Sequence, residues 1–288
     1  MSMHCHLATM RFKIATAMLI AVCAARLHAA DPYQEGFEAG TLSLSTLEVD
    51  GGCYTKSVNG YDSLGFASTP TASGSKALRV ELRGGDYGTC GDWSDGKTRT
   101  EIGHAIGLPL RFHSMGATKW YAFSFQLDKS FPLTSSALLL WQLVKKDGTG
   151  PELHIMTVKN SLKVKERWLS SGGELATNAL TLATGQWYRV IIQHKRSTGS
   201  DGFTKMWVNA NSESDKPIYT YNGPTAFGTD LPYVKQGLYT GDKTLTGTHI
   251  VYFDDVKVGD STATFSIING TASAATAAAP AAPLLSVK

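Results

Sequence analysis

Residues 137–173 read ALLLWQLVKKDGTGPELHIMTVKNSLKVKERWLSSGG, and they show the pattern from which the fold class is inferred. It holds three short runs rich in apolar residues, with turn-forming residues such as Lys146-Asp147-Gly148 between them. In the run Leu162–Trp168 apolar and charged side chains alternate, which is the period of a β-strand with one buried face. The stretch therefore predicts three consecutive strands.

The same pattern continues in both directions from this stretch, and turn residues recur between the runs. The expected strands are Ala77–Leu82, Trp120–Leu127, Ala137–Val144, Glu152–Val158, Leu162–Trp168, Trp187–Lys195, Phe203–Asn209, Val234–Tyr239 and His249–Val258. Many short strands separated by turns are typical of a β-sandwich or jelly roll. We expect one all-β domain over residues 31–268, without an internal repeat.

The two ends of the chain do not have this pattern. Arg11 and Lys13 precede an apolar run, Ile14–Ala25, and small residues follow up to Ala30. This order is typical of a secretory signal peptide over residues 1–30, and an uncleaved membrane anchor is the alternative. We therefore expect a secreted or periplasmic protein that has no membrane contact once the signal is removed.

The C-terminal residues 269–288 consist mainly of Ala, Ser, Thr and Pro, a composition that predicts a disordered tail. Removal of residues 1–30 takes away three basic residues and no acidic one, so that 24 of each remain. A net charge of zero argues against nucleic acid as a partner. Cys53 and Cys90 are the two cysteines that remain, and in an exported chain they predict one disulfide.

Several expected strands carry basic or aromatic side chains on one face. Lys163, Lys165 and Arg167 share a face of one strand, and Lys235 and Tyr239 share a face of another. A solvated outer sheet produces this pattern, and so does a groove that binds an acidic sugar chain. The number of such strands favours the groove.

Three motifs occur in order along the chain, followed by a characteristic closing strand. They are Arg99-Thr100-Glu101-Ile102, Trp141-Gln142-Leu143, Tyr233-Val234-Lys235-Gln236-Gly237-Leu238-Tyr239 and the closing Val251-Tyr252-Phe253-Asp254-Asp255-Val256. Their order resembles that of the jelly-roll polysaccharide lyases: the heparin lyase I-like and glucuronan lyase group, and more distantly the alginate lyases. The second motif departs from the alginate lyase pattern, because Val144 stands where those enzymes have His.

This resemblance implies a concanavalin-like β-jelly-roll with a concave substrate groove, and cleavage of a uronic-acid polysaccharide, most simply a glucuronan, by β-elimination. Gln142 and Arg99 would neutralise the uronate carboxylate by hydrogen bonding. Tyr239 would protonate the departing oxygen, and Lys235 beside it would let the phenol also accept a proton. For Arg99 a structural pair with Glu101 is an equal alternative.

The base that removes the C5 proton is expected to be a histidine. The resemblance favours His104, but strand alternation places His104 opposite Arg99 unless Gly103 marks a bulge. His154 is the second candidate. The expected substrate-binding residues are Lys235, Glu101, His154, Lys163, Lys165, Arg167 and Tyr188.

No cofactor is needed for this chemistry, and we expect a monomer. A structural calcium ion could lie where the first and last strands pair, held by Glu38 with Asp254 or Asp255. Two other functions fit the same sandwich. A glycoside hydrolase would need paired carboxylates, for which Glu101 and Glu152 are the candidates. A non-catalytic carbohydrate-binding module would need only the groove.

Overall fold

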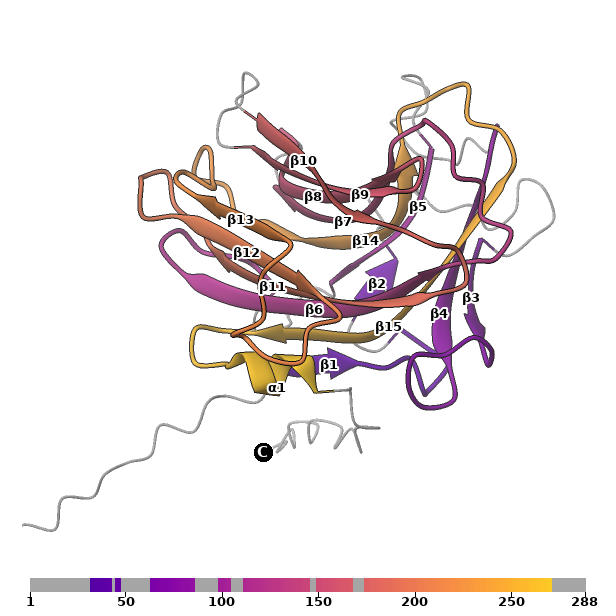
Figure 1. Cartoon of the computed structure of the whole chain (residues 1–288), viewed down its shortest axis with the longest axis horizontal. Coiled ribbons are helices and arrows are strands. Elements are labelled where there is room, and N and C mark those ends of the chain that lie inside the picture. The colour runs from indigo at the N-terminus through magenta and orange to yellow at the C-terminus, as the bar shows by residue number, and fades with distance from the viewer. Residues whose placement is uncertain are drawn as a thin grey trace, which may run out of the picture.

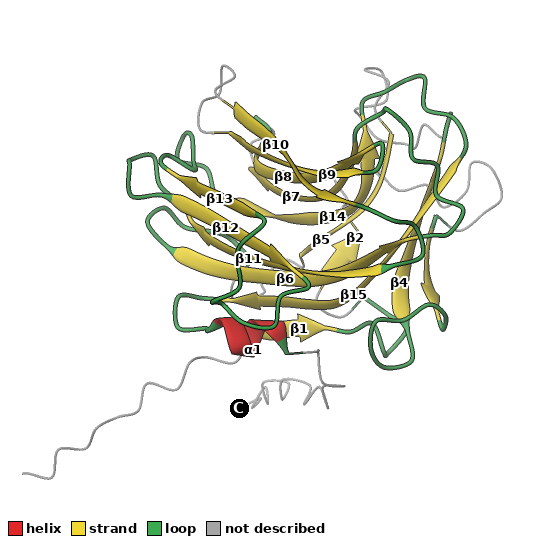
Figure 2. Ribbon diagram, viewed as in Figure 1, coloured by secondary structure: helices red, strands yellow, loops and turns green. Residues whose placement is uncertain are grey.

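The computed structural model describes residues 32–42, 45–47, 63–85, 98–104, 111–145, 149–167 and 174–270. In this part of the chain two antiparallel β-sheets are stacked face to face, and one short helix lies against the lower sheet (Figures 1 and 2). All nine strands expected from the sequence are present, with bounds that differ by no more than two residues. The all-β sandwich is thereby confirmed.

The lower layer in Figure 1 is an eight-stranded sheet, called sheet A here. Its order is β13 (Tyr219–Asn222), β12 (Phe203–Val208), β11 (Trp187–Lys195), β6 (Thr118–Leu127), β15 (Thr248–Gly259), β4 (Ala77–Arg83) and β3 (Leu64–Ala67), with β1 (Tyr33–Glu35) paired to β15. The first and last strands thus pair, as expected.

The upper layer, sheet B, has seven strands. Its order is β10 (Glu174–Thr181), β9 (Ser161–Arg167), β8 (Pro151–Val158), β7 (Leu138–Lys145), β14 (Pro232–Thr240), β5 (Thr98–His104) and β2 (Ser45–Leu47). In Figure 1 this sheet bends upward at both sides, so that its outer face is concave.

The core lies between the two sheets and is built from the apolar positions of each strand. Trp141 of β7 stacks on Phe123 of β6, with ring centroids 6.1 Å apart and planes at 9°. Both side chains are almost fully buried, at 2% and 1% exposure. Because inward-facing positions alternate with outward-facing ones, this core fixes which side chains of sheet B point outward.

Polar side chains are also buried between the sheets. Arg196 binds Glu152 through two parallel hydrogen bonds of 2.7 Å, and neither side chain is exposed. Glu166 accepts hydrogen bonds from Thr204 and Tyr219. Burial of a carboxylate is costly unless such partners are present, so these glutamates serve the core.

The helix α1 (Phe265–Asn269) lies on the outer side of sheet A. Its side chains Phe265 and Ile268 join Trp120 and Trp207 in a second apolar cluster. Residue 269, placed in the tail by composition, thus belongs to this helix. No helix among the described residues is long and apolar enough to span a bilayer.

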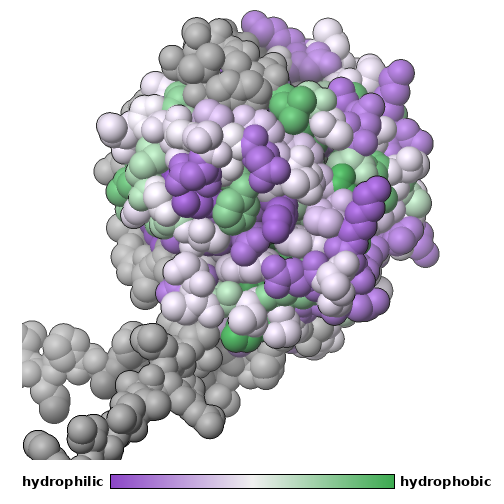
Figure 3. Space-filling model, turned by 60° about the vertical axis from the view of Figure 1, so that its left-hand side comes forward, coloured by the Kyte–Doolittle hydropathy of each residue, from purple (hydrophilic) through white to green (hydrophobic). Residues whose placement is uncertain are grey.

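Among the residues that the structure describes, few large apolar side chains are exposed. They are the single residues Met115, Leu133, Leu175, Leu231 and Ile267. The face shown in Figure 3 is mostly hydrophilic, with hydrophobic residues scattered singly. Scattered residues of this kind do not mark a protein-binding surface.

Candidate active site

The outer face of sheet B brings several of the expected residues into one row. Lys235 of β14 is the lateral partner of Gln142 on β7. Gln142 is in turn the lateral partner of His154 on β8, and His154 is that of Lys165 on β9. Lateral partners on one face of a sheet are close enough for their side chains to touch. Four predicted residues that are far apart in the sequence thus lie side by side.

A second row begins at Tyr239, and its lateral partners are Arg99 on β5 and Leu139 on β7. Between the first row and the second, β14 runs from Lys235 to Tyr239, whereas β8 runs only from His154 to Met156 and so has fewer residues between the rows. The register shifts in β7 and β14 account for this difference in the number of residues. The rows therefore converge toward β8, where two residues correspond to about 7 Å of strand.

Glu101 lies between the two rows and joins them. Its carboxylate accepts a hydrogen bond of 2.6 Å from Nε2 of Gln142 and one of 3.4 Å from Nη1 of Arg99. The Glu101 side chain is only 1% exposed. Both donors keep further N–H groups, because an amide nitrogen carries two and a guanidinium five. Glu101 therefore holds the two groups that were expected to bind a carboxylate.

The bond between Glu101 and Gln142 crosses β14, which separates β5 from β7, at Gly237. Gly237 has φ +148° and is the lateral partner of Glu101. A Cβ atom on Gly237 would lie 2.1 Å from the carbonyl oxygen of Thr100. The glycine of the third motif is thus required for the close approach of β14 and β5 beneath the Glu101 side chain.

Tyr239 is fixed by Arg99. The guanidinium carbon of Arg99 lies 4.4 Å from the centre of the Tyr239 ring, a cation–π contact. Contacts therefore link Tyr239, Arg99, Glu101 and Gln142 in a continuous chain. The alternative that Arg99 forms a structural pair with Glu101 is confirmed, and Arg99 contacts Tyr239 as well.

His154 is held in its uncharged form. Burial lowers the pKa of His154 to about 3, and the positive charges of Lys165 and Arg167 add to the effect. A hydrogen bond with the Pro151 backbone opposes this shift. Nε2 of His154 is buried and has no hydrogen-bond partner among the described residues. At neutral pH the imidazole is thus uncharged, with a free ring nitrogen beside Gln142.

Basic side chains border this site. In β9 Lys163, Lys165 and Arg167 are partly exposed, while Leu162, Val164 and Glu166 between them are buried. The expected basic face of β9 is therefore confirmed. Nζ of Lys235 lies 5.6 Å from the centre of the Tyr233 ring.

Two expectations need correction or remain open. Tyr188 does not reach this face: it is 3% exposed, stacks on Phe125 of β6 and accepts a hydrogen bond from the Ala183 amide. The prediction that it binds substrate was wrong, because its strand turns it into the core. For His104 the structure gives only the backbone: the register of β5 continues through Gly103 without a bulge, and the role of His104 stays a prediction.

Glu38 and Asp255, the expected calcium ligands, both bind the loop before β4. Glu38 accepts hydrogen bonds from Ser75 and Lys76, and Asp255 accepts one from Ser73. The described residues contain no group of three or more His, Cys, Asp or Glu side chains that could hold a metal. The calcium ion stays a prediction. Cys53, Cys90 and residues 1–30 lie outside the described residues, so the disulfide and the signal peptide also stay predictions.

One residue near the site was not anticipated. The Arg111 guanidinium carbon lies 4.8 Å from the centre of the Tyr233 ring and 4.9 Å from that of Phe112. Strand periodicity could not have indicated Arg111, because it belongs to a loop. It adds a cation at the end of β14 where Tyr233 lies.

Comparison with known proteins gives this geometry a context. A family model described as "Polysaccharide lyase" matches residues 37–257. A search among curated proteins found no match to the sequence.

Among solved structures, the fold is similar to that of an endo-β-1,4-glucuronan lyase from the fungus Trichoderma reesei. The identity is 20%, the alignment covers 78% of this chain and 98% of that one, and the TM-score is 0.57. The cellulose induced protein Cip1 is 18% identical, with 79% and 96% covered and a TM-score of 0.54. The alginate lyase AlgAT5 of polysaccharide lyase family 7 is 16% identical, with 76% and 94% covered and a TM-score of 0.52. At these identities the structures establish the jelly-roll fold.

Proposed function

Since this chain belongs to the polysaccharide lyase family, we propose that it cleaves a uronic-acid polysaccharide, of glucuronan type, by β-elimination on the outer face of sheet B. The observation that carries the proposal is the contact chain from Gln142 through Glu101 and Arg99 to Tyr239, with His154 beside it. The similar fold of a fungal glucuronan lyase supports the choice of substrate.

The substrate carboxylate would be bound by Gln142 and Arg99. As the C5 proton leaves, negative charge spreads onto this carboxylate, and donors already aimed at it stabilise the transition state. Glu101 holds both donors while it is itself shielded from solvent. Because Glu101 already holds these donors in place, they need not reorganise during the reaction, and this preorganisation is why they stabilise the transition state.

Two proton transfers complete the reaction. His154 would take the C5 proton on Nε2, the electron pair of the C5–H bond would form a C4–C5 double bond, and the C4–O bond would break. Tyr239 would give its phenolic proton to the departing oxygen. The products are an unsaturated uronate and a new reducing end, and no water is consumed.

In the free protein the pKa of His154 is too low for an effective base, so His154 can act as the base only when bound substrate favours its protonation. In the free protein its imidazole is neutral, because burial and nearby cations disfavour the charged form. A uronate carboxylate beside it would supply the missing negative charge and favour protonation. The position of His154 as the lateral partner of Gln142 supports it in preference to His104.

Hydrolysis is less well supported. Of the two glutamates that could serve as a carboxylate pair, Glu152 is buried between the sheets in its ion pair with Arg196. Glu101 is engaged by Gln142 and Arg99 on the other side of sheet B. A hydrolase needs its two carboxyl groups about 5–9.5 Å apart across one bond, with access to it.

We further propose that the protein is exported by its N-terminal signal, acts as a monomer and needs no cofactor for the reaction. The basic side chains of β9 and Lys235 would hold the acidic polymer. A structural calcium ion near Asp254 and Asp255 is consistent with the pKa of Asp254, which burial and the adjacent Asp255 raise to about 7. A cation there would relieve that burial cost.

The test of function is the ultraviolet absorbance of the elimination product on incubation with glucuronan, alginate, heparin and heparan sulfate. We expect absorbance to rise with glucuronan first. Reducing ends that appear without absorbance would indicate hydrolysis, and binding without new ends would indicate a binding module.

A further inference from the structure

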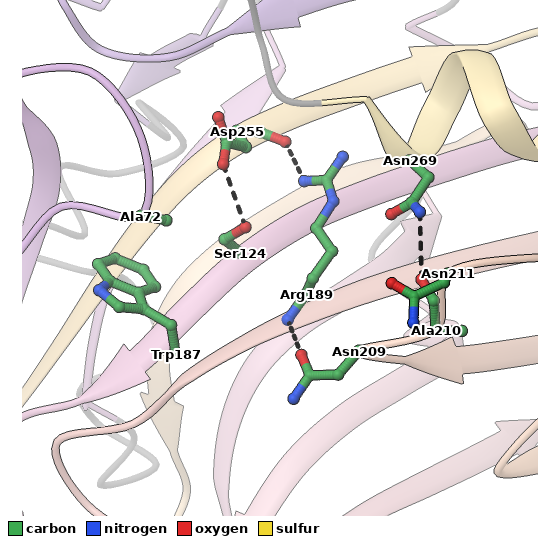
Figure 4. A pocket seen from close by; sticks show the side chains of 9 residues that line it. All are labelled: Ala72, Ser124, Trp187, Arg189, Asn209, Ala210, Asn211, Asp255 and Asn269. Atoms are coloured by element: carbon green, nitrogen blue, oxygen red, sulfur yellow. Dashed lines mark hydrogen bonds between the residues drawn. The ribbon is translucent and has the colours of Figure 1, made fainter.

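A pocket of about 330 Å³ lies on the outer face of sheet A, on the opposite side of the sandwich from the candidate active site. It lies between α1, the bulge of β15 and the ends of β11 and β12 (Figure 4). The residues that line it are Ala72, Ser124, Trp187, Arg189, Asn209, Ala210, Asn211, Asp255 and Asn269. It is thus rich in amide side chains and has one indole.

Several of these side chains keep unused hydrogen-bonding groups. The side chains of Trp187 and Asn211 have no hydrogen bond to any residue that the structure describes. Asn209 uses its Oδ1 to accept from the Arg189 amide, so its Nδ2 stays free. Asn269 donates through Nδ2 to the Ala210 carbonyl, so its Oδ1 stays free. Donors and acceptors are therefore available to a ligand.

The charged groups of the pocket are already engaged with the protein. Arg189 donates to the backbone carbonyls of Asp255 and Ile268. The Asp255 carboxylate accepts hydrogen bonds from Ser73 and Ser124. One positive and one negative charge offset each other, so the pocket favours an uncharged ligand. This differs from the outer face of sheet B, where cations line the site.

The pocket is also shaped by unusual backbone. Asn209 and Asp255 both have positive φ, at +53° and +50°. Asp255 lies in the bulge where β15 is paired with β6. Positive φ is costly for residues other than glycine, and such residues cluster at ligand sites. The two conformations direct both side chains into this pocket (Figure 4).

We propose that this pocket is a second carbohydrate site, which binds one uncharged glycosyl unit of a neutral polysaccharide. An indole offers an apolar face to the C–H face of a sugar ring. Side-chain amides pair with sugar hydroxyls because each amide can donate and accept. In Figure 4 the Trp187 indole lies on one side of Arg189, and Asn211 and Asn269 lie on the other. The site would attach the protein to a neutral polymer while the opposite face stays open.

This proposal does not depend on the lyase reaction, and its test uses the full-length protein with cellohexaose, xylohexaose, mannohexaose and maltohexaose. Binding is followed by calorimetry and by the indole N–H signal of Trp187 in ¹H–¹⁵N NMR spectra, identified with Trp187→Phe. A small site with few contacts predicts a Kd on the order of 1 mM for at least one of these sugars. We expect Trp187→Ala to weaken binding about tenfold or more, and Asn211→Ala to weaken it severalfold.

Asn222→Ala is the matched control, because Asn222 is an exposed asparagine of sheet A outside the pocket. Tyr239→Phe is the control for the opposite face. Both should leave the affinity within about twofold. The proposal is overturned if none of the four sugars binds up to about 10 mM. It is also overturned if a sugar binds while Trp187→Ala and Asn211→Ala, each with unchanged Tm, leave its affinity within about twofold of the wild type.

Discussion

Gln142 donates to Glu101 across an intervening strand: the two residues lie on β7 and β5, with β14 between them, yet their side chains meet at 2.6 Å. Neighbouring strands are about 4.8 Å apart, so both side chains must extend over β14 to make this bond. Gly237 of β14, the lateral partner of Glu101, lies at this crossing and lets the backbones of β14 and β5 approach closely. The glycine, the glutamate and the glutamine of three separate motifs thus form one structural unit.

The first prediction concerns this unit. Gln142→Ala removes one held donor and should lower kcat about 10²–10³-fold with little change in KM. Glu101→Ala should have a similar effect, because Gln142 and Arg99 lose their common acceptor. Glu101→Gln should recover much of the activity, since its carbonyl oxygen still accepts from the Gln142 amide. The assay is product absorbance, with Tm measured for each variant. Gln193→Ala on sheet A is the control, and a catalytic unit is excluded if all three variants match it.

The second prediction concerns Tyr239. Tyr239→Phe removes one hydroxyl and keeps the ring that contacts Arg99, so folding and binding should persist. Loss of a proton donor predicts a decrease in kcat of about 10²–10⁴-fold, with KM nearly constant. Steady-state kinetics on the cleaved polymer measures both. Full turnover by this variant would refute the assigned role of Tyr239, whatever the substrate proves to be.

The third prediction concerns the basic border of the site. Binding of an acidic polymer by Lys163, Lys165, Arg167 and Lys235 should weaken as salt screens the charges, so KM should rise between low salt and about 0.5 M salt. Lys165→Ala should raise KM about two- to fivefold and reduce this salt dependence, as expected for partly exposed charges. Lys216→Ala is the control, because Lys216 is an exposed lysine between β12 and β13. A KM that does not respond to salt would contradict the electrostatic model.

Strand alternation predicted much of this site. In β9 it placed three cations on one face correctly, because each is separated from the next by one buried residue. In β11 the same rule could have excluded Tyr188, since Val190 and Ile192 share its face and are buried. Alternation cannot show the register shifts in β7 and β14, which depend on pairing between distant strands. These shifts make the two rows converge, so how close His154 lies to the row of Tyr239 could not be read from the sequence, although His154 was a candidate base.

The pocket on sheet A was missed for a related reason. Trp187 and Arg189 alternate outward on β11, which is ordinary for a surface strand. Their partners come from the loop after β12, the bulge of β15 and α1. Only the folded chain brings these segments together.

The fourth prediction concerns stability in acid. Burial lowers the pKa of His113 and His154 below the value of about 6.5 expected in the unfolded chain. The unfolded chain therefore binds these protons first, and their contribution to stability is lost as pH falls below about 6.5. His154→Gln should lose less stability than the wild type between pH 7 and pH 5, by at most about 1.4 kcal/mol per pH unit. Asp254 acts in the opposite sense, because its pKa is raised to about 7. Urea unfolding gives the free energy of unfolding of both proteins at each pH, and the contribution of Asp254 cancels in the difference between them. If this free energy changed equally with pH in both proteins, the lowered pKa of His154 would be contradicted.

The last prediction separates the two candidate bases. His154 is uncharged in the free protein down to a pH near its pKa of about 3, so kcat/KM, which reports the free enzyme, should show no loss from this group between pH 7 and pH 5. His154→Ala should lower kcat about 10²-fold or more, and added imidazole should restore part of the activity, because a free base can enter the space left by the ring. Rescue of this kind is not expected for a residue that only supports the fold. His104→Ala should keep most of the wild-type activity, since the backbone register of β5 shows no bulge at Gly103. The opposite pattern, with His104→Ala inactive and rescued and His154→Ala active, would assign the base to β5 and require a rearrangement of that strand when substrate binds.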